Sequence, residues 1–531
     1  MPITNITVEN FKGVGSKVSI PLRPITLLFG ANSAGKSTIL QAMLYMRELL
    51  ERQNADADVL QGCGSAINLG GFRQFVHGHD LNKTVRIGIT MTMDDDGLPI
   101  YPVSRDPEEI DEPRQAALFP TLHSMRVVID VAWDSNTEKP WIVRYAVELE
   151  GKEVGHISAQ PGQKSRIKLL PLGIAMDDPN GGIAEDLEEI ENSFEEDLDE
   201  SPEMDVWDED SDSDGSIEAV AEYVVPKFGR ALQGLDFFFL EAAEFYDEPN
   251  YISILSRVFV GAGELVLREL NRIRYIGPMR TIPERGFTPV FSPDQGRWSD
   301  GSAAWDILHK EKDKPKWLNT KQISDLDLGY RIEQYRHIEI PCESVLGGAI
   351  EKIILGVGPD PFDVDAISAA DFKKLEVCSR LRLLTEESEI EVAPSDIGVG
   401  ISQVLPIVIG AMAPGYGILS VEQPELHIHP AVQCKLADLL AHQALCNDER
   451  MMLLETHSEH LILRLLRRVR EMNEGNLEPG SPEIRPEDLS ILYVTSRPEG
   501  LEITELPVTE DGDFDKPWPK GFFPERSKEL Y

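Results

Sequence analysis

The sequence of 531 residues predicts an α/β fold whose two halves are separated by a long insertion. Near the amino terminus, an apolar run with strand character is followed by a glycine-rich loop and a segment with helical spacing. From about residue 375 the pattern is strand, loop, helix, strand, helix, strand, which is typical of the second half of an α/β domain. Since a domain averages about 150 residues, the chain is long enough for two to four structural units.

The amino-terminal half is predicted to combine two kinds of strand. Residues 3–11 alternate apolar and polar side chains, 24–29 form a short apolar run, and helical spacing begins at Ser37. Three further alternating segments, separated by polar turns, indicate an antiparallel sheet attached to this half. These segments are 85–93, 125–133 and 141–149. We assign residues 1–150 to the amino-terminal lobe.

The insertion, residues 151–374, contains an acidic segment. Residues 177–218 hold 20 Asp or Glu and no Lys or Arg, so self-repulsion favours a solvated loop or an interaction tail. Residues 210–215 imitate the opening of a calcium-binding loop, but Ala221 stands at the twelfth position, where a bidentate Glu is needed. A plain acidic linker is therefore favoured. A helical stretch over 251–272 follows.

Two groups of arginines require an interpretation. Six lie within thirty residues, and in so acidic a chain they indicate a phosphate or carboxylate partner, for which the acidic segment is one candidate. They are Arg268, Arg272, Arg274, Arg280, Arg285 and Arg297. A second group is predicted to form a solvated helix face in preference to a docking surface. Its members are Arg464, Arg467, Arg468 and Arg470.

Composition limits the partners and the compartment. The chain has 51 Lys and Arg against 92 Asp and Glu, a net charge of −41, so only a local patch could contact nucleic acid, and no membrane contact is expected. The five cysteines are scattered and form no CxxC pair, which favours a reduced, cytoplasmic protein. The first residues lack the pattern of a signal peptide, and no apolar run has the length of a membrane span.

The glycine-rich loop carries the clearest motif in the chain. Residues 30–37, GANSAGKS, fit GxxxxGK[ST] at every fixed position, between a strand-like run and a helical segment. Such a loop binds the phosphates of ATP through backbone N–H groups, while Lys36 reaches the β- and γ-phosphates and Ser37 ligates Mg²⁺. The predicted nucleotide-binding residues are Gly30, Ala31, Asn32, Ser33, Ala34, Gly35, Lys36, Ser37 and Thr38.

Two later strands end in polar residues. The apolar run 418–421 is followed by EQPE at 422–425, and the run 451–454 is followed by ETHS at 455–458. An open α/β sheet binds its ligands at such carboxyl ends. His427 and His429 could suggest a metal pair, but without a third ligand a turn that packs the two imidazoles is favoured.

The order of these motifs resembles the ABC-type ATPase heads of the SMC, RecF and OLD group. Within that group, the chain is similar to stand-alone bacterial predicted ATPases of the AAA family, which are similar to antiphage defence ATPases. The shared segments are SDIGVGISQVLP at 395–406 and WPKGFF at 518–523. The resemblance implies a split ABC-type head of the P-loop NTPase fold, with a carboxy-terminal lobe over residues 375–531.

The resemblance also implies roles for individual residues. Glu422 takes the position of the magnesium-side carboxylate, Gln423 that of the general base, and His457 that of the histidine that senses the γ-phosphate. A signature-like loop would contact the nucleotide of the opposite subunit through Gly400, Ser402 and Gln403. Two further positions are implied beside the nucleotide and its metal, Lys12 and Gln74.

Two departures from the group affect the expected chemistry. Gln423 cannot accept a proton, which predicts slow ATP hydrolysis or a substitute base such as Glu425 or His427. The signature-like loop lacks the full LSGGQ string, so its role follows from its position only.

The implied function is an ATPase that dimerises, or forms a higher oligomer, around ATP and controls a separate effector protein, in bacterial antiphage defence. A RecF-like DNA-repair ATPase is one alternative and would need a basic channel. A module that binds ATP without cleaving it is another, suggested by Gln423. A transporter ATPase is weaker, because its membrane half would have to be another polypeptide.

Overall fold

The computed structural model describes most of the chain. The described residues are 2–31, 34–60, 67–94, 97–101, 122–170, 217–221, 223–233, 235–237, 248–284, 287, 289–290, 296–310, 316–338, 340–356, 377–446, 450–498 and 500–516. Asn32, Ser33 and Arg285, nearly all of the acidic segment, and the WPKGFF tail lie outside them.

A six-stranded sheet joins the two ends of the chain. Its strand order is β11-β15-β16-β3-β17-β18, and every neighbouring pair is parallel except the antiparallel pair β17 and β18. The strands are β3 (Ile25–Gly30), β11 (Ile273–Ile276), β15 (Ile418–Glu422), β16 (Met451–Glu455), β17 (Leu489–Arg497) and β18 (Gly500–Glu505). Because β3 lies beside β16, the predicted split α/β fold is confirmed.

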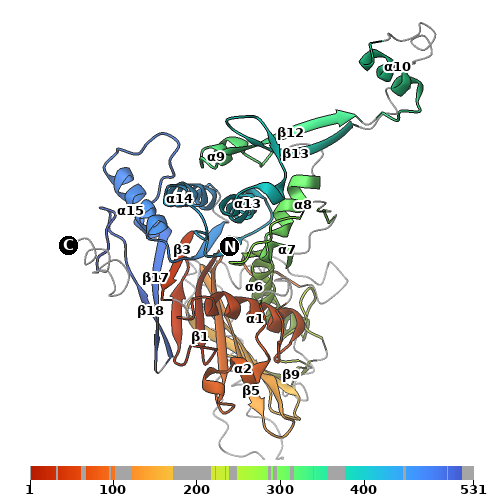
Figure 1. The fold of residues 1–531 in the computed structure, drawn as a ribbon. Helices are drawn as coiled ribbons and strands as arrows, with labels where there is room; N and C mark the ends of the chain where they lie inside the picture. The colour runs from red at the N-terminus through yellow and green to blue at the C-terminus, as the bar shows by residue number, and fades with distance from the viewer. Residues whose placement is uncertain are drawn as a thin grey trace, which may run out of the picture.

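The two faces of this sheet bury different layers. Leu28 of β3 joins a core that contains α1 (Thr38–Arg52) and α6 (Ala262–Asn271), whereas Leu27 and Phe29 face the opposite core. This alternation follows the period of two of a strand. The opposite core is built by three helices, α13 (Val399–Met412), α14 (Pro430–Leu445) and α15 (Glu459–Asn473). Figure 1 shows both layers.

A nine-stranded antiparallel sheet covers α1 and α6 on their other side (Figure 1). The three predicted strands are confirmed as β4 (Val85–Thr92), β5 (Ser124–Asp134) and β6 (Lys139–Leu149). The sheet continues past residue 150, because β7 pairs with β6 and further strands follow. The others are β1 (Ile3–Glu9), β2 (Val18–Pro21), β7 (Lys152–Ser158), β8 (Ser165–Leu169), β9 (Ile217–Ala221) and β10 (Asp236–Phe237).

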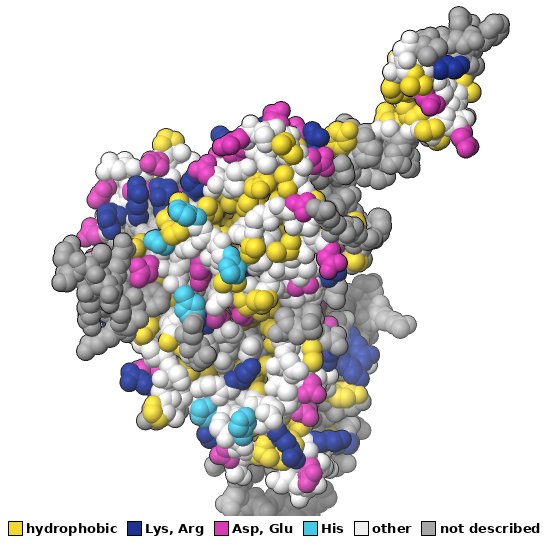
Figure 2. All heavy atoms as spheres, viewed as in Figure 1, with side chains coloured by type: hydrophobic (Ala, Val, Ile, Leu, Met, Phe, Trp, Pro, Cys, Tyr) yellow, Lys and Arg dark blue, Asp and Glu magenta, His cyan; other side chains and the backbone are white. Residues whose placement is uncertain are grey.

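The region between the lobes includes an arm. The predicted helical stretch forms α5 (Glu248–Leu255), a π-helical turn η5 (Ser256–Gly261) and α6. Further along, β12 (Tyr330–Ile338) and β13 (Val377–Thr385) pair and project from the body, with α10 (Val345–Ile354) at the end (Figure 1). Hydrophobic side chains gather over this end (Figure 2), and Ile354 is 78% exposed.

Smaller elements complete the described part of the chain. The short helices are α2 (Phe72–Phe75), α7 (Gly296–Ser299), α8 (Ser302–Lys310) and α9 (Thr320–Ser324), and the 3-10 turns are η2 (His77–His79), η6 (Pro394–Asp396) and η7 (Pro486–Asp488). A short strand, β14 (Glu391–Val392), pairs with β13. None of the helices in the described residues combines the length and apolar character that a membrane crossing requires.

The first arginine group is mostly occupied within the chain. Arg272 contacts Glu269 at 3.0 Å and Arg297 contacts Asp306 at 2.6 Å, so local carboxylates are their partners. Arg274 and Arg280 are 7% and 5% exposed and donate to backbone carbonyls, so the prediction of a partner-binding group is wrong for these two. The spacing of these two arginines in the sequence does not indicate burial, which depends on how the segment packs against α13 and β15.

The second arginine group also differs from its prediction. Arg464 and Arg468 of α15 both donate to Asp438 of α14, and Arg468 is 2% exposed. Two of the four arginines that were predicted to face solvent therefore hold α15 against α14. The two remaining members have partners on the surface, Glu471 for Arg467 and the carbonyl of Asp511 for Arg470.

Candidate functional site

The loop between β3 and α1 needs glycine at two positions. Gly30 has φ +148°, and a Cβ there would lie 2.1 Å from the carbonyl oxygen of Val494. Gly35 has φ +91°, and its Cβ would lie 2.6 Å from Leu501 Cδ1. Because L side chains rarely adopt such φ values, the backbone favours glycine at both positions, and at Gly30 a Cβ would also collide with backbone atoms.

Lys36 lies inside this loop, with 3% of its surface exposed. Its Nζ donates to the carbonyl oxygens of Ala31 at 3.0 Å and Gly30 at 3.3 Å. Burial lowers the pKa of Lys36, while the carboxylates of the strand ends, Glu455 first, oppose this shift. The ammonium group is therefore held in the hollow of the loop, where a triphosphate would meet a concentrated positive charge.

The backbone around Lys36 also fits a phosphate. Within the described residues, no hydrogen bond uses the N–H groups of Gly35, Lys36 or Ser37, which immediately precede α1. Backbone donors before a helix start and the positive end of the helix dipole both favour an anion. Ala31 is exposed, Ala34 is buried, and Thr38 is the buried first residue of α1.

Two carboxylates face the loop from neighbouring strands. Glu422 ends β15 and Glu455 ends β16, and the parallel register places these two residues opposite each other. The Ser37 hydroxyl donates to Glu455 Oε2 at 2.6 Å, and Lys36 Nζ lies 3.8 Å from Glu455 Oε1. Carboxylate and hydroxyl oxygens are the ligands that Mg²⁺ prefers, so this cluster fits the metal that accompanies a nucleotide.

Both carboxyl groups have a raised pKa, and the charge of Glu455 contributes to the shift at Glu422. Burial, followed by the charge of Glu455, raises the pKa of Glu422 to about 7, against hydrogen bonds from Tyr275 and Ser37. Burial also raises the pKa of Glu455. A divalent cation between them would remove this repulsion, because it favours both charged forms.

Sequence reasoning placed Glu455 at a strand end but gave it no role, and it missed Tyr275. Tyr275, in β11, donates its hydroxyl hydrogen to Glu422 Oε1 at 3.0 Å. Glu455 holds the same place in β16 that Glu422 holds in β15, as the last residue of an apolar run, and that symmetry was a signal in the sequence. Tyr275 gave no comparable signal, because β11 is distant in the chain.

His457 contacts Lys36 directly, as its Nε2 lies 3.2 Å from Lys36 Nζ. An ammonium group only donates, so Nε2 is the acceptor and the ring is neutral. Burial and the charge of Lys36 lower the pKa of His457, which agrees with that state. Glu425 accepts hydrogen bonds from the Thr456 hydroxyl and the His457 backbone N–H, both at 2.7 Å, and so positions the histidine.

Gln423 follows Glu422 in a left-handed conformation, with φ +46°. Its N–H donates to the carbonyl of Glu455 at 2.7 Å, which fixes it beside the two carboxylates. A residue other than glycine in this region is strained and persists only where its surroundings hold it. The strain therefore lies at the position implied for the base.

The signature-like residues lie at the start of α13, and their side chains face inward. Ser402 is fully buried and donates to the carbonyl of Val399 at 2.8 Å, and Gln403 is 6% exposed. The backbone of Gly400 packs against His427, since a Cβ at Gly400 would lie 2.6 Å from the His427 carbonyl oxygen. Val399, by contrast, is 50% exposed, so the accessible part of this segment is its first turn.

The two remaining implied residues differ in position. Lys12 donates to Gln41 in α1 at 2.6 Å, one turn beyond Ser37, and burial lowers the pKa of Lys12. Gln74 is an exposed residue of α2 that lines a shallow pocket beside Arg73. Within the described residues no hydrogen bond joins Gln74 to the phosphate loop, although the next residue, Phe75, accepts the N–H of Lys12 at 2.5 Å.

The histidine pair does not form a metal centre in the described residues, which contain no group of three or more potential His, Cys, Asp or Glu ligands. His427 and His429 are exposed, and His429 accepts the N–H of Ala431 through Nδ1 at the start of α14. His429 is thus a helix cap.

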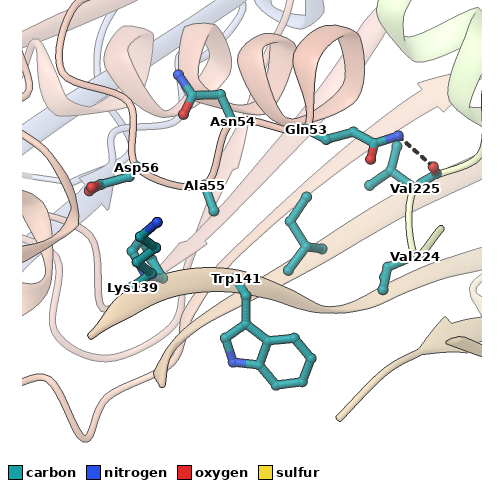
Figure 3. A pocket seen from close by; sticks show the side chains of 10 residues that line it. Gln53, Asn54, Ala55, Asp56, Lys139, Trp141, Val224 and Val225 are labelled. Carbon is teal, nitrogen blue, oxygen red and sulfur yellow. Dashed lines mark hydrogen bonds between the residues drawn. The ribbon is translucent and has the colours of Figure 1, made fainter. Parts of the chain in front are cut away.

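A separate pocket of about 510 Å³ lies at the far end of α1. Figure 3 shows Trp141 and Lys139 of β6 on one side, and Gln53 donating to the Val225 carbonyl on the other. Fifteen helical residues separate this end of α1 from the phosphate loop, about 22 Å at 1.5 Å per residue. The pocket is therefore distinct from the nucleotide site.

The raised pKa of Glu422 predicts a gain in stability on its removal. The folded pKa of about 7 exceeds the ordinary value of 4.5, so stability falls as pH rises between these values. In protein free of nucleotide and Mg²⁺, we expect Glu422→Gln to raise the melting temperature by roughly 2 °C at pH 8. A much smaller gain is expected at pH 5, just above the ordinary value, where native Glu422 is protonated.

Differential scanning calorimetry at both pH values checks this prediction. Glu425→Gln is the matched control, because that carboxylate accepts two hydrogen bonds and its loss should lower the melting temperature. A gain of equal size for Glu422→Gln at pH 5 and pH 8 would contradict the assigned ionisation.

Comparisons with known proteins agree with the phosphate loop. Residues 1–134 match the family described as AAA ATPase domain, and residues 484–531 match a family described as protein of unknown function (DUF3696). No curated protein matches the chain. Together with the phosphate loop and the strand order, the first match supports an ATPase domain of the P-loop type.

Several solved SMC heads share distant similarity with the whole chain. The SMC head domain from Thermotoga maritima is 8% identical, with a TM-score of 0.35, and covers 96% of this chain and 100% of its own. The Smc head with an extended coiled coil from Pyrococcus furiosus, bound to the C-terminal domain of ScpA, is 12% identical, with a TM-score of 0.34 and coverages of 100% and 98%. The head with a coiled coil and joint from Pyrococcus yayanosii is 11% identical, with a TM-score of 0.35 and coverages of 95% and 97%.

Proposed function

We propose that this protein binds MgATP in the loop before α1, hydrolyses it slowly, and associates with a second copy of itself while ATP is bound. One observation carries this proposal. Ser37, Glu422, Glu455 and His457, which come from chain segments hundreds of residues apart, converge on Lys36. Such a group meets the needs of phosphoryl transfer. These are a loop that holds the phosphates, a metal end formed by Ser37 and Glu422, and a group beside the γ-phosphate, His457.

Each residue has a task in this site. The N–H groups before α1 and the Lys36 ammonium hold the triphosphate, and Lys36 exchanges the carbonyls of Gly30 and Ala31 for phosphate oxygens. Ser37 and Glu422 hold Mg²⁺, which, when bound, neutralises charge that develops on the phosphates. Once Lys36 turns toward the nucleotide, Nε2 of His457 is free, and a neutral ring that shifts its hydrogen to Nε2 can donate it to the γ-phosphate.

Gln423 sets the expected rate. An amide side chain can orient a water molecule but cannot take its proton, so turnover is slow unless a neighbouring carboxylate does so. The earlier candidates are less suitable, since both Glu425 oxygens accept hydrogen bonds and His427 is exposed. Glu455 contacts both Ser37, a predicted magnesium ligand, and Lys36, which would bind the phosphates. Because of its contact with Ser37, we assign Glu455 to the metal end, beside Glu422, and not to the role of the base.

We base the proposed association with a second copy on the first turn of α13. This turn is exposed at Val399 while its other side is anchored to the loop after β15 through Gly400 and His427. It thus offers a helix start, with its backbone donors, to the nucleotide of a second subunit. In this arrangement ATP is bound between two heads. The two subunits associate when ATP binds and separate when it is cleaved.

The biological role we propose is a sensor or scaffold that controls a separate effector protein, in bacterial antiphage defence. It is supported by the resemblance carried by residues 395–406 and the WPKGFF tail. The net charge of −41 does not favour a DNA clamp. A protein that binds ATP without cleaving it remains the second candidate, on the specific ground of Gln423, and phosphate release by the native protein separates the two.

The association predicts a change in mass with ATP. We expect light scattering to show a doubling or more of the molar mass in MgATP, relative to nucleotide-free protein. Val399→Asp, which places a carboxylate at the exposed helix start, should bind ATP and stay monomeric, because it opposes the approach of phosphate. Ile354→Asp on the exposed arm is the control. An unchanged mass for the native protein would contradict ATP-dependent association.

A further inference from the structure

Arg280 lies between the metal end of the site and α13. It is 5% exposed, and its Nη2 donates to the carbonyl of Glu422 at 2.6 Å and to that of Gln423 at 3.2 Å. The guanidinium group therefore holds the backbone of Glu422, the last residue of β15, and of Gln423, which follows it. It touches neither nucleotide-facing side chain, so any role in the reaction acts through the positions of these residues.

The same arginine is joined to α13 in both directions. Its Nη1 lies 3.4 Å from the Gln403 carbonyl, and the Gln403 side-chain amide donates to the Arg280 carbonyl at 2.8 Å. Gly400, one turn earlier, packs against the carbonyl of His427 in the loop that follows Gln423. A displacement of the strand end would therefore be passed to the first turns of α13 through contacts that are buried and short.

Two features indicate that this junction has more than one arrangement. Gln423 is held in a strained left-handed conformation, with φ +46°. Arg280 Nε is buried and has no hydrogen-bond partner within the described residues. Buried donors are almost always satisfied, and residues held in strained conformations gather at switching sites, so a second arrangement could relieve both.

We propose that Arg280 is a positioning residue that couples the filling of the metal end at Glu422 to the orientation of the first turns of α13. The regulatory meaning rests on the proposed function, in which those turns meet the second subunit. Arginine suits the task because its planar fork holds three carbonyls at fixed angles. A lysine would keep the positive charge, but its single ammonium group could not donate to all three carbonyls in the same geometry. The contact between the end of β15 and α13 would therefore be weaker.

Arg274 provides a matched control within the same fold. It is 7% exposed and donates to the carbonyls of Gly410, Ala413 and Pro414, at the other end of α13. Its guanidinium also lies over the rings of Trp298 and Tyr416. Arg274→Lys therefore disturbs a buried arginine that caps the same helix but does not touch the strand end. A merely structural role for Arg280 predicts that both lysine variants behave alike.

Hydrogen–deuterium exchange measured by mass spectrometry tests the coupling. The full-length native protein, Arg280→Lys, Gln403→Ala and Arg274→Lys are compared with and without MgATP, at a concentration where each is monomeric. In native protein and Arg274→Lys we expect MgATP to alter exchange in peptides covering residues 396–406. In Arg280→Lys and Gln403→Ala we expect that response to be lost, and in Arg280→Lys fluorescence titration should show ATP binding within about threefold of native.

A second readout addresses association. Sedimentation in MgATP should show about tenfold weaker self-association for Arg280→Lys and Gln403→Ala, and unchanged association for Arg274→Lys. The coupling is overturned if MgATP leaves residues 396–406 of the native protein unchanged, or if Arg280→Lys and Arg274→Lys respond equally. If the exchange response follows the expectation but no variant self-associates, the coupling stands and ATP-dependent association fails.

Discussion

Replacing Lys36 with Ala should remove ATP binding. The ammonium group lies in the hollow of the phosphate loop with 3% exposure, and no other cation among the described residues contacts the loop carbonyls. Losing a buried charge that pairs with a ligand phosphate costs at least about 3 kcal/mol, which exceeds a hundredfold in Kd. Fluorescence titration with a labelled ATP analogue measures this loss directly.

Two lysine controls separate this effect from a general loss of charge. Lys12→Ala removes a half-buried lysine that donates to Gln41 beside the same helix, and we expect a weaker effect on binding. Lys139→Ala alters an exposed residue of the pocket in Figure 3 and should change nothing. Circular dichroism confirms folding of each variant. Binding by Lys36→Ala within about threefold of native would remove the assignment of the loop.

Replacing Glu455 with Gln should mainly affect the metal. Glu455 accepts the Ser37 hydroxyl at 2.6 Å and lies opposite Glu422, so its charge contributes to the pocket that takes Mg²⁺. The amide keeps the size and removes the charge. We expect phosphate release to fall by about 10- to 100-fold, and the Mg²⁺ concentration that supports half of maximal ATP binding to rise by a similar factor.

The control is a glutamate outside the site. Glu474→Gln alters the exposed C-cap of α15, the helix that follows Glu455 in the chain, and should leave both measurements unchanged. Glu422→Gln should reduce phosphate release at least as strongly as Glu455→Gln, because Glu422 takes the implied magnesium position. If Glu455→Gln behaved like Glu474→Gln, Glu455 would be a structural neighbour of Ser37 and no part of the metal end.

The sequence predicted those parts of the site that depend on local patterns. The phosphate loop is a continuous motif, so Gly30, Gly35, Lys36 and Ser37 could be assigned before any fold was known. The strand that ends at Glu422 was equally visible, because an apolar run before a polar turn marks a buried strand.

Contacts that depend on strand order could not be read from the chain. The strand β16 lies between β15 and β3, and this order places Glu455 against Ser37. Burial was similarly hidden, since Arg274 and Arg280 have the spacing of surface arginines but bind backbone carbonyls in the interior. Side-chain direction was hidden too, because Gln403 faces Arg280 within its own subunit.

The central claim is that one site unites the loop before α1 with the ends of β15 and β16. A crystal structure of the protein with ATP and Mn²⁺, with anomalous scattering to locate the metal, tests it most directly. We predict one manganese peak bound by the Ser37 hydroxyl and the Glu422 carboxylate, with the triphosphate against Lys36. A metal or triphosphate bound away from Ser37, Glu422 and Lys36 would contradict the account.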